Sequence, residues 1–185
     1  MTEYEKLCYI LNDSFLSEHQ DEMVEYKGSG KPQKVLIDNG KRTITRSLYR
    51  FDLDKFDFVP FFNNKEGTPE GLRKFCDYIL IAYFKSITYV LLIEMKRGDT
   101  SSAPKQLNAS ETFIRYLYQT AERLHKDFSD TFTLFDKNKI KLRKIVIKQS
   151  KSNKNGTQGE KKIDIKADPI VYQSSGQFLL PKFLH

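Results

Sequence analysis

The sequence is poor in the side chains that build metal centres from sulfur or nitrogen ligands. Its 185 residues include only two cysteines, Cys8 and Cys76, and three histidines. Two cysteines are too few for a four-cysteine zinc or iron–sulfur site, and no His-x-x-His or His-Glu-x-x-His spacing is present. Each cysteine stands in an apolar context, which favours a reduced core residue over a disulfide and predicts a cytoplasmic location.

Long apolar runs are also missing. The most apolar stretch is interrupted by Lys85, Ser86 and Thr88, so we expect no membrane helix. The N-terminus has neither a basic region nor a long apolar segment, and it predicts no secretory signal. There is no Gly-x-Ser-x-Gly of a serine hydrolase, and Gly28-Ser-Gly-Lys31 lacks the spacing of a phosphate-binding loop.

The large side chains that are present suffice for one core. The chain has 14 Phe and 10 Tyr but no Trp, and its length suits a single domain. We therefore predict one α/β domain over residues 1–185. Its core would cover about residues 1–150, and a basic loop and C-terminal strands would fill residues 151–185.

Positive charge is concentrated in one part of the chain. Residues 137–166 hold eleven Lys and Arg against Glu160 and Asp164, a balance of +9, whereas the whole chain carries +7. A polyanionic partner such as nucleic acid fits this asymmetry, with Lys148, Lys151 and Lys154 among the expected contacts. The alternative is a lysine-rich surface loop that only keeps the protein soluble.

Residues 77–96 form the most informative stretch. Between Asp77 and Glu94 nearly every residue is apolar, aromatic or Thr, which predicts a hairpin of two buried strands. A turn at Lys85-Ser86 would set Asp77 directly opposite Glu94, with Lys96 on the same face. An odd-length loop would instead put the two acids on opposite faces. Two carboxylates so close suit an oxygen-liganded cation such as Mg²⁺, unless these residues are ordinary strand-end charges in solvent.

The N-terminal part of the chain predicts one helix and a second hairpin. An apolar stripe at helical spacing indicates a helix within residues 3–17. Asn39-Gly40 lies between two strand-like runs, residues 35–38 and 41–44, and is typical of a two-residue hairpin turn. The second arm would continue through Phe51 as the first strand of the core.

The C-terminal part predicts a helix and further strands. An apolar stripe indicates a helix over residues 104–128, and residues 140–149 contain a strand. Because both faces of the central hairpin are apolar, we expect helices on both sides of the sheet. The apolar segment 178–184 predicts an edge strand or a contact between copies of the chain.

The pattern around the central hairpin resembles a known family. Asp77 on one strand, followed by Glu94-Met95-Lys96 near the end of the next strand, resembles the PD-(D/E)xK nuclease superfamily with its restriction endonuclease-like fold. The specific part covers these three residues, and Cys76 stands where the motif has its proline. The resemblance implies an α-β-β-β-α-β core, with a central mixed sheet flanked by helices. It also implies Mg²⁺ or Mn²⁺ held by Asp77 and Glu94 for phosphodiester hydrolysis.

The resemblance extends to supporting residues. Lys96 would orient the attacking water or stabilise charge on the phosphate, and Gln106 at the start of the following helix would assist it. Family members often add an acid from the first helix, which here would be Glu5 or Glu18, unless these are only solvated helix charges. The expected nucleic-acid contacts are Arg73, Lys74, Lys105, Lys148, Lys151 and Lys154.

The sequence thus predicts a metal-dependent nuclease, with DNA as the favoured substrate and a bacterial restriction or anti-phage role by analogy. A non-catalytic nucleic-acid-binding or scaffold module on the same fold is the first alternative. A basic interaction protein without any nucleic-acid role is the second.

Overall fold

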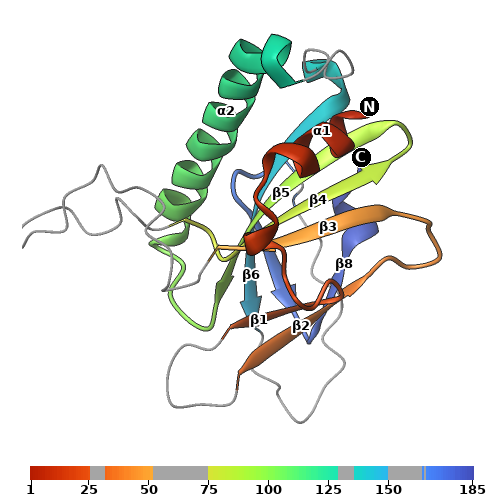
Figure 1. Cartoon of the computed structure of the whole chain (residues 1–185). Coiled ribbons are helices and arrows are strands. Elements are labelled where there is room, and N and C mark those ends of the chain that lie inside the picture. The colour runs from red at the N-terminus through yellow and green to blue at the C-terminus, as the bar shows by residue number, and fades with distance from the viewer. Residues whose placement is uncertain (26–31, 52–74, 129–135, 150–163, 165) are drawn as a thin grey trace, which may run out of the picture.

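The computed structural model describes residues 1–25, 32–51, 75–128, 136–149, 164 and 166–185, and the chain is a mixed α/β protein (Figure 1). The strands are β1 Glu22–Glu25, β2 Gln33–Asp38, β3 Thr45–Arg50, β4 Tyr78–Phe84, β5 Ile87–Lys96, β6 Ile140–Gln149, β7 Ile170–Ser174 and β8 Gln177–Leu179. The helices are α1 Glu3–Ile10 and α2 Ala103–Phe128, with 3₁₀ turns η1 Asp13–Phe15, η2 Lys137–Lys139 and η3 Leu180–Phe183.

Among the described residues, the larger sheet has five strands in the order β3-β4-β5-β6-β7. β3, β4 and β5 are antiparallel neighbours, whereas β5, β6 and β7 run parallel. A parallel pair needs a long crossover, and α2 supplies the one between β5 and β6. The predicted helix at 104–128 and the predicted strand at 140–149 are therefore confirmed.

The β4–β5 hairpin has the predicted register. Phe84 pairs with Ile87, and the pairing continues outward to Tyr78 opposite Ile93. Both turn residues have positive φ, 50° at Lys85 and 62° at Ser86, as a type I′ turn requires. Neither residue favours this conformation, which costs each of them about 1–2 kcal/mol. Burial of most residues of the two strands outweighs that cost.

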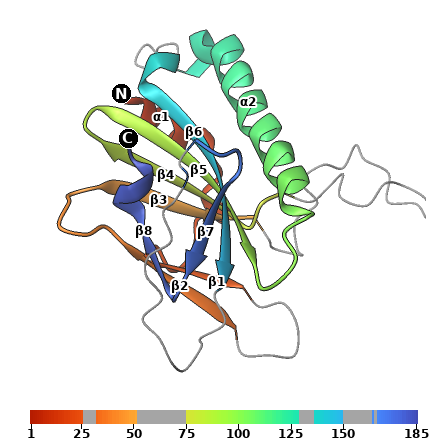
Figure 2. The ribbon, with the colours of Figure 1, turned by 180° about the vertical axis from the view of Figure 1, so that it is seen from behind.

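The two faces of the larger sheet are covered differently. α1 and α2 pack on the same face, where Leu7, Leu107 and Ile114 are buried against the sheet. The other face is covered by a smaller sheet, β1-β2-β8 (Figure 2). Its Met23 and Phe178 side chains enter the core. The prediction of helices on both faces is wrong, because apolar strand faces require a cover but do not determine its secondary structure.

The predicted hairpin at Asn39-Gly40 is also wrong. β2 pairs with β1 and β8, whereas β3 pairs with β4 in the larger sheet, so residues 39–44 carry the chain from one sheet to the other. The turn chemistry itself is present: Gly40 has a φ of 59°, and its N–H donates to Asp38 Oδ1 at 2.7 Å. Such a turn fixes the local backbone conformation, but it does not determine which strand β2 pairs with.

The N-terminal helix is shorter than the 3–17 segment suggested. α1 ends at Ile10, and η1 follows at Asp13–Phe15. Within the described ranges, no helix combines the length and the hydropathy needed to cross a membrane.

The apolar C-terminal segment belongs to the core. β8 is an edge strand of the smaller sheet, as one of the two predictions had it. Phe178 and Phe183 stack at 4.7 Å between ring centroids, and Tyr172 meets both rings edge-on. Since Phe178, Phe183 and Leu184 are buried, the chain uses these side chains internally.

Candidate active site

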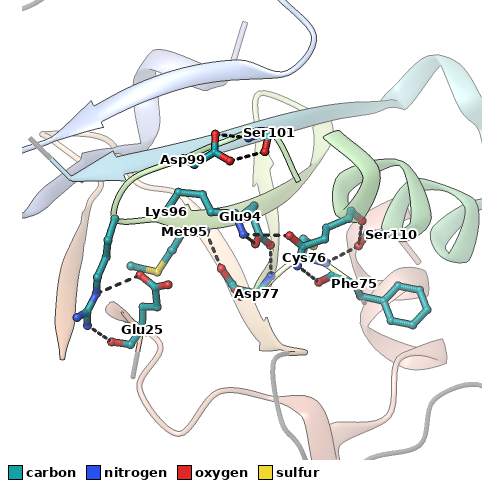
Figure 3. A network of polar contacts seen from close by, with 12 residues as sticks. Glu25, Phe75, Cys76, Asp77, Glu94, Met95, Lys96, Asp99, Ser101 and Ser110 are labelled. Carbon is teal, nitrogen blue, oxygen red and sulfur yellow. Dashed lines mark hydrogen bonds and ion pairs between the residues drawn. The ribbon is translucent and has the colours of Figure 1, made fainter. Parts of the chain in front are cut away.

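The predicted acids meet at one end of the larger sheet, where β4 begins and β5 ends (Figure 3). Asp77 precedes the first residue of β4, and the hairpin register sets it beside Glu94. The Asp77 N–H donates to Glu94 Oε2 at 3.2 Å, and the Met95 N–H donates to Asp77 Oδ2 at 2.6 Å. Each carboxylate is thus held by the backbone of the neighbouring strand.

Lys96 and Gln106 extend this group to the start of α2. Lys96 Nζ lies 2.6 Å from Glu94 Oε1 and donates a hydrogen bond of 3.0 Å to Gln106 Oε1. Gln106 Nε2 donates to the Phe75 carbonyl at 3.4 Å. The structure therefore brings together the four residues that the sequence nominated as catalytic: Asp77, Glu94, Lys96 and Gln106.

Both carboxylates are buried. Asp77 is 2% exposed and Glu94 0%, while the Lys96 side chain keeps 15% of its surface accessible. An ionised carboxylate that is withdrawn from water needs an opposite charge and hydrogen-bond donors close by. Lys96 and the two backbone N–H groups meet that need, so the buried carboxylates are compensated within the protein.

Cys76 adds a neutral neighbour to the acids. Burial raises the pKa of its thiol to about 12; the hydrogen bond with Ser110 is the largest opposing effect, and the nearby Glu94 and Asp77 charges add smaller effects that raise the pKa. Its N–H donates to Ser110 Oγ at 2.8 Å, and Ser110 Oγ donates in turn to the Gln106 carbonyl at 3.0 Å. The thiol therefore stays protonated at neutral pH, a state unsuited to nucleophilic attack or metal binding.

The donor set suits a hard cation in part. Asp77 and Glu94 offer the carboxylate oxygens that Mg²⁺ prefers. Among the residues that the structure describes, no group of three or more His, Cys, Asp or Glu side chains is arranged to hold a metal. Mg²⁺ commonly binds through one or two carboxylates and keeps several waters, so this pair fits that mode once Glu94 is released from Lys96.

Glu5, the proposed third ligand, does not join this group. Its carboxylate accepts a 2.6 Å hydrogen bond from the Thr2 N–H, and the bonds with Thr2 lower its pKa. The neighbouring Tyr4 ring lies 6.4 Å from that of Tyr83, six residues along β4 from Asp77. Six strand residues span roughly 20 Å, so Glu5 lies toward the opposite end of the strand.

The other candidate acid, Glu18, is exposed. It lines a cavity of about 180 Å³ together with Arg50 and Tyr78. None of its described contacts links it to the two buried carboxylates.

Two of the six predicted nucleic-acid contacts can be placed. Lys148 on β6 stands in register beside Lys96, and Lys105 is exposed in the first turn of α2. Asp99 lies near Lys148; hydrogen bonds from Ser101 lower its pKa most, and Lys148 adds a smaller effect in the same direction. The remaining four predicted contacts, Arg73, Lys74, Lys151 and Lys154, lie outside the described residues.

The sequence did not reveal the link from this site to the smaller sheet. Arg97 donates to the Glu25 carbonyl at 3.0 Å, and its Nε lies 3.5 Å from Glu25 Oε2 (Figure 3). Glu25 is 5% exposed at the end of β1. No sequence pattern signals this pair, since Glu25 ends β1 of the smaller sheet and Arg97 follows β5 of the larger sheet.

Comparisons of the chain with protein-family models, with curated proteins and with solved structures find no match. A functional assignment therefore depends on the geometry of the residues at the β4–β5 edge.

Proposed function

We propose that this chain is a metal-dependent nuclease with a restriction endonuclease-like core, acting most readily on DNA. The observation that carries the proposal is the register of Asp77 against Glu94, with Lys96 and Gln106 bonded to the same group. The order α1, β3, β4, β5, α2, β6 agrees with the α-β-β-β-α-β core of that family, with β1 and β2 inserted after α1.

In this proposal Asp77 and Glu94 hold Mg²⁺ or Mn²⁺. When bound, such an ion neutralises charge on the scissile phosphate and makes a water molecule more acidic. Lys96 would exchange its ion pair with Glu94 for a contact with the phosphate or with that water, stabilising the charge that develops. Gln106 would keep the ammonium group directed toward the reacting atoms, because it binds Lys96 from α2.

Basic residues next to the site would hold the polynucleotide. Lys148 lies beside Lys96 on the adjacent strand, and Lys105 is exposed on the first turn of α2. Lysines bind the phosphate backbone without reading bases, so we expect binding that depends on salt and little on sequence.

Burial of the acids favours a second candidate, a nucleic-acid-binding module without catalysis. Glu94 has no exposed surface and lies against Lys96, so a cation can bind only after this ion pair opens. If the pair never opens, the chain binds nucleic acid in a salt-sensitive manner but does not cleave it. Calorimetric titration with Mn²⁺ separates the two candidates, because only the nuclease binds the ion through Asp77 and Glu94.

The direct test is a cleavage assay with linear and circular DNA in Mg²⁺ or Mn²⁺. We expect the wild type to cut, and Glu94→Gln and Lys96→Met to lose at least about a hundredfold in rate, as removal of a transition-state contact does. Lys34→Met is a matched control, because Lys34 forms a surface ion pair with Glu22. Undiminished cleavage by both site variants would refute the proposal.

A further inference from the structure

A second cavity lies away from the candidate active site. It has a volume of about 550 Å³, is open to solvent, and is bounded by α2, β6 and the segment that leads into β7. Small-molecule sites usually measure about 300–1,000 Å³, so the cavity is large enough for an organic ligand.

The interior of this cavity offers an apolar surface. Tyr118 from α2, Leu142 from β6 and Ile170 at the start of β7 contribute to its walls. Burial is the main cause that raises the pKa of Tyr118, so its hydroxyl stays neutral. A planar or apolar group could therefore enter without meeting an uncompensated charge from this ring.

Two acids of the cavity, Glu111 and Asp168, are paired with cations, and Glu122 also lines it. Lys144 Nζ lies 2.8 Å from Glu111 Oε2 and 3.2 Å from Asp168 Oδ2. Arg115 binds Glu111 as well, at 2.6 Å. These cations lower the pKa of Glu111, with the Lys144 hydrogen bond as the largest cause. Glu111 and Asp168 thus have cationic partners within the protein and do not require a cationic ligand.

The exposed cations of the cavity come from opposite walls. The Arg115 side chain is 67% exposed on α2, and Lys166 is exposed on the segment before β7. The guanidinium bonds Glu111 through Nε and one terminal nitrogen, and its other terminal nitrogen can donate to a ligand. A lining that combines apolar side chains with accessible cations suits an anion that carries a planar or apolar body.

The cavity and the candidate active site lie on the same face of the larger sheet. Lys144 and Lys148 are four residues apart on β6, so they share a face at a spacing of roughly 13 Å. Lys148 stands beside Lys96 in the β5–β6 register. Lys144 of the cavity and Lys148 beside the active site therefore lie on the same face of β6, which α2 covers between them at Val146.

We propose that this cavity binds a nucleotide unit, with the base against Tyr118 and Leu142 and the phosphate between Arg115 and Lys166. The class of ligand, an anion with a planar body, rests on the cavity alone. Its identification as a nucleotide rests on the proposed nuclease function. The unit is either a free nucleotide or one residue of a single strand.

The test is a nuclear magnetic resonance titration of the ¹⁵N-labelled full chain with deoxyadenosine monophosphate, inorganic phosphate and an oligodeoxyadenosine. We expect the mononucleotide to shift amides of α2 and β6. Arg115→Ala should weaken binding about tenfold, the loss of one charge-assisted contact. Ala167→Trp should fill the cavity and abolish binding. The control is Arg123→Ala, which removes an exposed charge from α2 that does not line the cavity.

Each outcome decides something. Tighter binding of the oligonucleotide supports a strand residue, and equal affinity supports a free nucleotide. Equal shifts with phosphate alone, or mononucleotide shifts that survive in Ala167→Trp, would overturn the inference. Cleavage of DNA without nucleotide shifts at the cavity rejects the inference only. Nucleotide shifts at the cavity without any cleavage reject the nuclease proposal only.

Discussion

Replacement of Lys96 by Met tests whether the ion pair with Glu94 is as buried as its geometry indicates. The substitution keeps the length of the side chain but leaves a carboxylate with 0% exposure without its cation. Removing one partner of a buried pair typically costs about 3–5 kcal/mol of unfolding free energy. We expect a loss in that range at pH 7, measured by urea denaturation.

Two further variants make this prediction specific. Lys34→Met removes a cation that is 58% exposed from its pair with Glu22, and it should cost no more than about 1 kcal/mol. The double variant Glu94→Gln/Lys96→Met removes both charges and should recover most of the loss, giving a large coupling in a double-mutant cycle.

The reasoning is refuted if Lys96→Met is no more destabilising than Lys34→Met at pH 7. It is equally refuted if Glu94→Gln fails to rescue the stability of Lys96→Met. Either result would mean that Glu94 reaches water or another cation in solution.

Three further predictions concern the surroundings of the site and the cavity. Ser110→Ala should lower the free energy of unfolding in urea by about 1–3 kcal/mol, because the buried Cys76 N–H loses its acceptor. A loss below about 0.5 kcal/mol, the size expected for an ordinary surface substitution, would contradict this prediction. Cys76, whose pKa is raised to about 12, should resist iodoacetamide in the native state at pH 8, while the less buried Cys8 should react faster. Mass spectrometry of the labelled peptides measures both rates, and equal rates would count against a buried environment for Cys76. The pKa of Glu111 is lowered below its ordinary 4.5, so its contribution to stability is complete above pH 4.5 and is lost as pH falls through the lower pKa of the folded state. Glu111→Gln should therefore flatten the pH dependence of the urea midpoint below pH 4.5. An unchanged slope would argue against the Lys144 and Arg115 contacts.

The central hairpin was predictable because its signals are local and agree with one another. A dense run of apolar and β-branched residues, broken only at Lys85-Ser86, leaves one turn that keeps both arms buried. Register then follows from the turn, and the approach of Asp77 to Glu94 follows from register. Gln106 was predictable for a similar reason. The connection from β5 to α2 is short, so the first turn of α2 lies near the end of β5.

The failures share a different cause. Asn39-Gly40 specifies a turn, yet the pairing partners of β2 and β3 depend on which arrangement buries the apolar faces of the strands. The smaller sheet, and with it the contact of Arg97 with Glu25, arises from segments far apart in sequence. Glu5 was nominated by analogy, whereas its position is set by the Thr2 cap and by the packing of Tyr4 near the hairpin turn.

The most direct test of the central claim is a crystal of the wild-type chain grown with Mn²⁺, examined by anomalous diffraction. We predict an anomalous peak within coordination distance of Asp77 and Glu94, about 2.0–2.3 Å for such oxygen ligands, with Lys96 displaced from Glu94. An intact Glu94–Lys96 ion pair without a peak at saturating Mn²⁺ would contradict the account.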